Sequence, residues 1–274
     1  MSILLYIILF TALGGLLSVM AASLFLLLSE KLQEKVLPHG VSFAIGALLT
    51  GAFCGLIPQA FAEVPVADIS KLSMSIMIGI LFFFIMEKLL VWRHCHSQVC
   101  EAHGEDFQAL NHQHQTSRNA SSPAGVFIIV GDSIHNFVDG ILITAAFLTD
   151  VQLGIVTSLA VAAHEIPQEV GDFAILLHSG YSRGKALFYN VLSSLATVIG
   201  GLLAYFSLDK LHGTLPYLLT LAASSFIYIA VADLIPSLHQ KTGTKTSLQQ
   251  IGFILAGVGL ILFMQSIVHA HADS

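Results

Sequence analysis

Residues 130–140 read VGDSIHNFVDG and lie inside a longer apolar run, residues 123–148. Asp132, His135 and Asp139 therefore stand at positions where hydrocarbon is expected to surround the chain. An ionisable side chain at the bilayer centre costs about 3 kcal/mol or more, depending on the scale. A bound metal ion, a proton path or a water-filled cavity would offset this cost, and the stretch predicts one of the three.

The composition indicates an integral membrane protein. Of the 274 residues, 55% are hydrophobic and 10% are charged, whereas an ordinary soluble domain has about 25% charged residues. The mean hydropathy is +0.81. The sequence has no basic cluster interleaved with aromatic residues, the pattern typical of a nucleic-acid surface. Its three cysteines do not form a disulfide framework. We predict an all-α, multi-pass protein in a lipid bilayer, without a nucleic-acid partner.

Eight apolar runs are long enough to cross a bilayer, which requires about 20 residues of helix. The predicted spans are about 3–28, 38–61, 72–92, 123–148, 151–177, 186–207, 214–236 and 248–268. The first run exceeds the roughly 7–15 residues of a signal-peptide core, and no Lys or Arg precedes it, so we predict a retained helix. Residues 1–274 are expected to form a single transmembrane domain.

The basic residues predict the orientation of these spans. Nine of the 11 Lys and Arg residues lie in the odd-numbered connections, and cytoplasmic connections carry an excess of basic residues. The odd-numbered connections are therefore predicted to be cytoplasmic, with both termini on the other side of the membrane. The short chain favours a bacterial inner membrane, with a eukaryotic organelle as the alternative.

Polar residues gather in two of the predicted spans, at offsets of three and four that share a helical face. They are Asp132, His135, Asn136 and Asp139 in span 123–148, and His164, Glu165, Gln168, Glu169 and Asp172 in span 151–177. Imidazole, carboxylate and amide groups suit Zn²⁺ and tolerate Fe²⁺, Mn²⁺ or Cd²⁺. Single carboxylates such as Asp132, Glu169, Asp172, or Asp233 in span 214–236, are equally well explained as structural hydrogen bonders. The group as a whole is too costly for packing alone and predicts a metal site.

A catalytic reading of these motifs is less favoured. HEIPQ at residues 164–168 begins like the zinc-protease motif HExxH, but Gln168 replaces the second histidine and Pro167 interrupts the pattern. The chain has no nucleophile elbow and no GxxxxGK[ST] phosphate loop. These absences argue against an enzyme, and we predict no organic cofactor. A membrane metal sensor without net flux and an intramembrane metalloenzyme remain the alternatives to transport.

HNFVDG and HEIPQEVGD together resemble the ZIP family of divalent metal transporters, in the subgroup with the motifs HNFxDG and HExPHExGD. LIPQA at residues 56–60 and ADLIP at residues 232–236 are similar to the second and seventh helices of that family. The resemblance implies eight helices in a 3 + 2 + 3 arrangement with inverted outer triplets, and a homodimer. It also implies that Zn²⁺, or Fe²⁺, Mn²⁺ or Cd²⁺, moves into the cytoplasm by alternating access between the fourth and fifth helices.

The resemblance further implies two neighbouring metal sites. The first takes His135, Asp139, His164 and Gln168, and the second takes Asn136 and Glu165, with Asp139 able to bridge. Additional positions along the transport path are Asp132, Glu169, Asp172 and Thr197. Gln168 departs from the subgroup, which usually has histidine there, and a neutral amide is the weaker ligand. Thr197 stands where some relatives have a further carboxylate, so the first site is the better supported of the two.

The connection at residues 93–122 is hydrophilic and rich in histidine. Its potential ligands are His94, Cys95, His96, Cys100, His103, His112 and His114. Short His/Cys tracts bind metals, although the spacing matches no compact zinc-finger pattern. We expect this cytoplasmic connection to receive or sense the metal, with a plain hydrophilic linker as the alternative.

Overall fold

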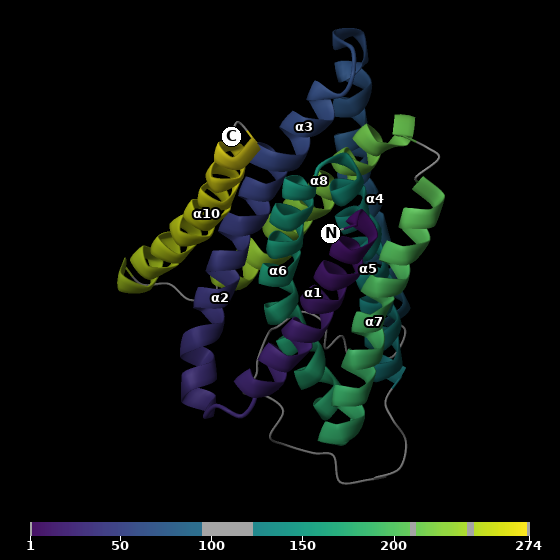
Figure 1. Ribbon diagram of the computed structural model, residues 1–274. Coiled ribbons are helices and arrows are strands. Elements are labelled where there is room, and N and C mark those ends of the chain that lie inside the picture. The colour runs from purple at the N-terminus through teal and green to yellow at the C-terminus, as the bar shows by residue number, and fades with distance from the viewer. Residues whose placement is uncertain (1, 95–122, 209–211, 240–243, 273–274) are drawn as a thin grey trace.

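The computed structural model describes residues 2–94, 123–208, 212–239 and 244–272, which are almost entirely helical and contain no strand (Figure 1). Four short 3₁₀ or π segments, named η, interrupt or precede the helices. The helices are α1 (Ile3–Phe25), α2 (Glu30–Thr50), α3 (Ile57–Ala62), α4 (Ile69–His94), α5 (Pro123–Thr149), α6 (Val151–His178), α7 (Arg183–Leu208), α8 (Leu215–Tyr228), α9 (Ile235–His239) and α10 (Thr244–Ala272). The short segments are η1 (Gly51–Leu56), η2 (Val66–Asp68), η4 (His212–Thr214) and η5 (Ile229–Leu234).

Seven helical segments of the described chain are long and apolar enough to cross a membrane. Two of them combine a π segment with two helices: α2, η1 and α3 form one, and α8, η5 and α9 form the other. The remaining long helix, α6, has 28 residues, and its polar side chains make it less apolar than the others. With α6 included, the described residues contain the eight expected spans, and the prediction of an all-helical, multi-pass membrane fold is confirmed.

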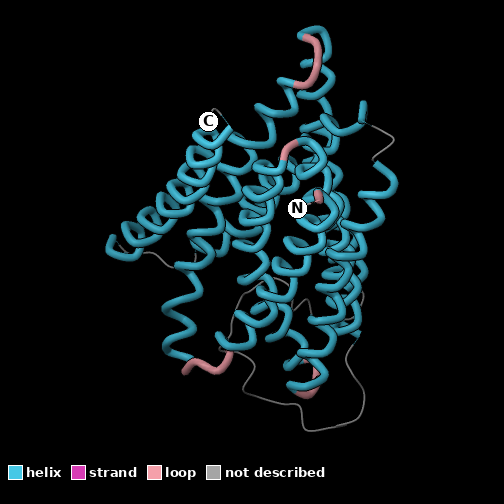
Figure 2. Tube along the Cα trace, viewed as in Figure 1, coloured by secondary structure: helices cyan, strands magenta, loops and turns pink. Residues whose placement is uncertain are grey.

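Consecutive spans run in opposite directions through the bundle. The turns at residues 26–29 and 179–182 lie at the lower end in Figure 2, and the turn at residues 63–65 lies at the upper end. Helices α5 and α6 pack against each other, and both contact α1 and α7. Helix α2 packs on α10, and α4 packs on α8. The two helices with the polar motifs are therefore enclosed by the rest of the bundle.

Glycines bring two pairs of helices into backbone contact, as small residues do in membrane bundles. A Cβ atom at Gly140 of α5 would collide with the carbonyl oxygen of Thr197 in α7, and one at Gly200 of α7 would collide with the carbonyl oxygen of Phe137. Thr144 Oγ1 adds a 3.1 Å hydrogen bond to the carbonyl oxygen of Gly201. Helix α5 is thus held tightly against α7 along the part that carries the polar motif.

The contact between α2 and α10 depends on glycine in the same way. A Cβ atom at Gly257 of α10 would collide with the carbonyl oxygen of Phe43 in α2, whereas one at Gly259, two residues further on, would meet nothing within 4 Å. We expect Gly257→Ala to lower the stability of the protein by about 1–3 kcal/mol, as overpacking does. Gly259→Ala is the matched control and should be neutral or stabilising by up to about 1 kcal/mol, because alanine favours helix.

The measurement is the midpoint of thermal unfolding of both variants in the same detergent. Equal midpoints for the two variants would contradict the close approach of α2 and α10 at Gly257.

Two π-helical segments occupy corresponding places in the two halves of the chain. Segment η1 ends two residues before Pro58, and η5 ends two residues before Pro236. Proline inside a helix lacks an N–H group, and its ring displaces the carbonyl one turn earlier. A π turn accommodates this locally without ending the helix. The matching pair agrees with the inverted relation that the sequence motifs imply for the second and seventh spans.

A single residue connects the two central helices. Asp150 lies between α5 and α6, and its carboxylate caps α6 by accepting hydrogen bonds from the backbone N–H groups of Gln152 and Leu153, both at 2.9 Å. This is the usual chemistry of an N-cap. At the other end of α6, Gly180 has φ 86°, a left-handed conformation that suits glycine and stops the helix. Helices α5 and α6 therefore form a closely tied antiparallel pair.

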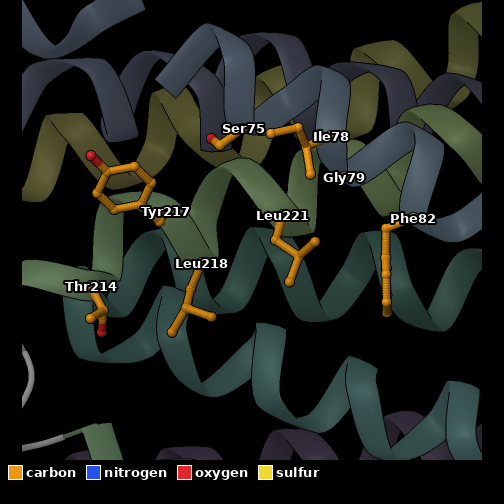
Figure 3. Close-up of a pocket in the computed structure, with 8 residues that line it drawn as sticks. All are labelled: Ser75, Ile78, Gly79, Phe82, Thr214, Tyr217, Leu218 and Leu221. Atoms are coloured by element: carbon orange, nitrogen blue, oxygen red, sulfur yellow. The ribbon is translucent and has the colours of Figure 1, made fainter. Parts of the chain in front are cut away.

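A groove of about 380 Å³ lies between α4 and α8, and its lining is mainly apolar (Figure 3). Its lining residues are Ser75, Ile78, Gly79, Phe82, Thr214, Tyr217, Leu218 and Leu221. Ser75 and Thr220 join the two helices at its edge through hydroxyl groups 2.6 Å apart. The groove has no charged or histidine side chain and so is not a metal site.

Candidate metal centre

Four side chains of α5 and α6 converge on one point between these helices. His135 and Asp139 are one helical turn apart on α5, and His164 and Glu165 are neighbours on α6. One ligand atom from each of them lies within 4.8 Å of all the others. The spacing of four residues on α5 works as expected, because such residues lie on the same face of a helix.

His135, Asp139, His164 and Glu165 are named the four-donor cluster, because each offers one atom that can donate an electron pair to a metal ion. The distances between these atoms are those of a small coordination site. His135 Nε2 lies 3.2 Å from His164 Nε2, and Asp139 Oδ2 lies 3.6 Å and 3.4 Å from these two nitrogens. Glu165 Oε1 lies 3.6 Å from His135 Nε2 and 3.8 Å from His164 Nε2. Ligand atoms about 2.0–2.1 Å from a tetrahedral Zn²⁺ are about 3.3–3.4 Å from one another. The observed spread thus suits an ion of this size.

The cluster is buried and rich in unsatisfied acceptors. Asp139, His164 and Glu165 are each 1% exposed, and His135 is half-buried. Neither carboxylate oxygen of Asp139 or Glu165 has a hydrogen-bond partner among the described residues. Buried charged groups are normally paired or coordinate a metal ion. A divalent cation bound by the two carboxylates and the two imidazoles would give these oxygen atoms the partner that they lack.

The backbone fixes the orientation of one imidazole. His164 Nδ1 lies 3.3 Å from the carbonyl oxygen of Ala160, one turn earlier on α6. Because a carbonyl oxygen only accepts, Nδ1 carries the hydrogen and donates it. Nε2 then presents its lone pair to Asp139 and His135, which is the arrangement usual for a metal-bound histidine.

The amide side chains of the two motifs turn toward Asp132 instead. Asn136 Nδ2 donates to Asp132 Oδ1 at 2.9 Å and to the Asp132 carbonyl oxygen at 3.2 Å. Gln168 Nε2 donates to the same Asp132 Oδ1 at 3.3 Å. Thr197 Oγ1, from α7, donates to Asn136 Oδ1 at 2.7 Å. These four residues form a polar network beside the four-donor cluster.

A cavity of about 310 Å³ begins at His164 and Gln168 and extends along the lower half of α6. Helix α2, segment η5 and helix α9 complete its walls, with Leu37, Asp233 and Ser237 among its lining residues. Asp172, one of the predicted path residues, also lines it. The cavity thus lies between the four-donor cluster and the end of the bundle that carries the turns at residues 26–29 and 179–182.

The structure distributes the predicted site residues in three groups. His135, Asp139, His164 and Glu165 form the cluster; Asp132, Asn136, Gln168 and Thr197 form the adjoining network; and Asp172 lines the cavity together with His164 and Gln168. Glu169 is fully buried, and its carboxylate has no hydrogen-bond partner among the described residues.

Asp233 of the ADLIP motif lines the same cavity, although the sequence alone explains this carboxylate equally well as a structural residue and does not predict it as part of the site. The ligands predicted in the His-rich connection fall outside the described residues, except that α4 ends at His94.

The fold and the site together define a class: a multi-pass membrane protein with four buried or half-buried potential metal ligands gathered between two central helices. A family model described as "ZIP Zinc transporter" matches residues 1–265. The chain therefore belongs to the ZIP family, as the motifs HNFVDG and HEIPQEVGD indicated.

Individual relatives agree with this assignment. The chain is similar to "Metal cation symporter ZIP14" of Mus musculus, with 28% identity over 307 residues, which cover 89% of the chain and 62% of the relative. It is similar to "Zinc transporter ZIP13" of Homo sapiens, with 30% identity over 262 residues, which cover 81% of the chain and 69% of the relative. "Zinc transporter foi" of Drosophila melanogaster is 40% identical over 140 residues, which cover 50% of the chain and 19% of the relative.

The chain spans less than two thirds of the length of the first of these relatives. All three are transporters by name, in agreement with the prediction that the protein is not an enzyme.

Proposed function

We propose that the protein transports Zn²⁺ across its membrane through the four-donor centre between α5 and α6. The observation that carries this proposal is the convergence of His135, Asp139, His164 and Glu165, whose ligand atoms lie within 4.8 Å of one another. The names of the relatives, two of them zinc transporters and one a metal cation symporter, support the same substrate class.

The donor set favours zinc over the abundant hard cations. Mg²⁺ and Ca²⁺ prefer oxygen ligands and more of them, whereas imidazole suits Zn²⁺ and other transition metals. The carboxylates of Asp139 and Glu165 would balance the two positive charges of the ion, which makes its residence inside the membrane possible. Fe²⁺, Mn²⁺ and Cd²⁺ are the competing substrates that this chemistry admits.

We place one ion in the four-donor cluster. Gln168 lies at its edge, where the cavity begins, and would offer an amide oxygen to an ion that leaves the cluster. The second site implied by the family motif needs Asn136, and that amide is engaged by Asp132 and Thr197. A second ion would therefore bind only after these hydrogen bonds break.

The proposed direction of transport is into the cytoplasm. The cavity lies on the side of the turns at residues 26–29 and 179–182, and basic residues such as Lys31 and Lys35 or Arg183 and Lys185 flank these turns. An excess of basic residues marks the cytoplasmic side. The ion would enter from the opposite side, lose its water in the cluster and leave through the cavity, by alternating access. A homodimer, a bacterial inner membrane and a metal-receiving role for the His-rich connection remain predictions.

Uptake of radioactive zinc into proteoliposomes tests this function against its two rivals. We expect saturable accumulation of zinc inside vesicles that contain the protein, and only background in protein-free vesicles. If the protein were a metal sensor or a metalloenzyme, the purified protein would bind zinc but the vesicles would accumulate none. Binding without accumulation would therefore overturn the proposal.

A further inference from the structure

One carboxylate beside the proposed transport site, Asp132, accepts hydrogen bonds from two amide side chains. Asp132 is 6% exposed and lies one turn before Asn136 on α5. Its Oδ1 atom accepts hydrogen bonds from two amide groups, Asn136 Nδ2 at 2.9 Å and Gln168 Nε2 at 3.3 Å. Asp132 therefore joins the polar motif of α5 to that of α6.

These bonds determine which end of each amide faces which way. A carboxylate oxygen accepts hydrogen bonds, so Asn136 and Gln168 must both turn their NH₂ groups toward Asp132. The oxygen of Asn136 then faces Thr197, whose hydroxyl group donates to it at 2.7 Å. The oxygen of Gln168 is left free of Asp132, on a side chain that lines the cavity together with His164.

The orientation of Gln168 matters because an amide can bind a cation only through its oxygen. The NH₂ group carries partial positive charge and would repel the ion. Oxygen and nitrogen differ little in size, so packing alone distinguishes the two orientations poorly, and a hydrogen-bond partner must select one of them.

We propose that Asp132 is a positioning residue that holds Gln168 with its amide oxygen toward the transported cation. This inference rests on the proposed function. Asp132 would raise the affinity for the metal by orienting Gln168. The neutral amide of Gln168 could then offer its oxygen to an ion beside the cluster.

A pair of substitutions distinguishes this role from a merely structural one. Asp132→Asn keeps the shape of the side chain but adds an NH₂ group, which lets the Gln168 amide turn around. Gln168→Glu introduces two equivalent oxygens, which need no orientation and would be repelled by the Asp132 carboxylate. Asp132→Asn should therefore weaken zinc binding when residue 168 is Gln and strengthen it in the Gln168→Glu background.

Four proteins are compared: the unaltered protein, Asp132→Asn, Gln168→Glu and the double variant. For each, calorimetry in detergent gives the affinity for zinc, and proteoliposomes give the uptake of zinc. In the Gln168 background, we expect Asp132→Asn to weaken binding by about 10- to 100-fold, as loss of an outer partner of a ligand does. The KM for zinc should rise more than kcat falls. In the Gln168→Glu background, the same change should lower the Kd and the KM.

Thr197→Val is the control, because it removes the partner of Asn136 and leaves the bond between Gln168 and Asp132 intact. Its effect should have the same sign in both backgrounds. If Asp132→Asn does not yield folded protein, Asp132→Ser, which also lacks a carboxylate, takes its place in the same cycle.

An equal loss of affinity from the change at Asp132 in both backgrounds would overturn the positioning role. Absence of uptake by the unaltered protein would instead overturn the proposed function, while the binding measurement would still test Asp132.

Discussion

Replacement of Asp139 by Asn should reduce zinc uptake at low zinc concentration by more than about 100-fold, because removal of even an outer partner of a metal ligand costs about 10- to 100-fold. Asp139 Oδ2 lies within 3.6 Å of both cluster histidines, and the residue is 1% exposed. Its loss leaves a single carboxylate, Glu165, against the two charges of the ion. Water cannot compensate in so buried a site. The measurement is the initial rate of radioactive zinc uptake into proteoliposomes.

Asp68→Asn is the matched control for this substitution. It is the same chemical change at a surface position, where the carboxylate forms a 2.7 Å ion pair with Lys71. Exposed ion pairs contribute about 0–1 kcal/mol to stability, so uptake should remain close to that of the unaltered protein. Equal rates for Asp139→Asn and Asp68→Asn would refute the assignment of Asp139 as a ligand.

The second large effect is expected from Gly140→Val. Even a Cβ atom at Gly140 would collide with the backbone of α7 at Thr197 and Gly201, and valine adds two further methyl groups. The two helices must separate, at a cost of about 1–3 kcal/mol or more. The separation displaces Asp139, the preceding residue, and so disturbs its alignment with His164 and Glu165 on α6. We therefore expect both a lower midpoint of thermal unfolding and loss of zinc binding in detergent.

Gly184→Val serves as the control in α7, because a Cβ atom at Gly184 would meet nothing within 4 Å. It should bind zinc as the unaltered protein does and unfold at a similar temperature. If Gly140→Val behaved in the same way, the backbone contact between α5 and α7 would not be needed to shape the metal centre.

The sequence predicts the spans well because the bilayer imposes one length scale on every crossing helix. It predicts their ends less well. Helix α2 begins at Glu30, before the apolar run at residues 38–61, and Pro38 lies inside it. Charged first turns of a helix can extend beyond the hydrocarbon, where an apolar run gives no information. The sequence also shows Pro58 and Pro236 without showing that π turns accommodate them.

The sequence likewise predicts one part of the candidate metal centre and not the other. The offset of four residues places His135 and Asp139 together, because helix geometry alone determines their common face. The direction of the amide side chains depends on tertiary contacts. Thr197 is 61 positions from Asn136, and the bond between Gln168 and Asp132 crosses from α6 to α5. No pattern within one helix predicts such contacts.

The carboxylate oxygens of Asp139 and Glu165, which have no hydrogen-bond partner among the described residues, would link metal binding to folding if the cluster binds the proposed ion. The two carboxylates lie close together in a buried site and repel each other, and a bound cation would offset this repulsion. A cation that binds the native protein and not the unfolded chain adds stability by mass action, about 2.7 kcal/mol at 100 times its Kd. The concentration of the metal in the cell would then affect how long the folded protein persists, as well as how fast it transports the ion.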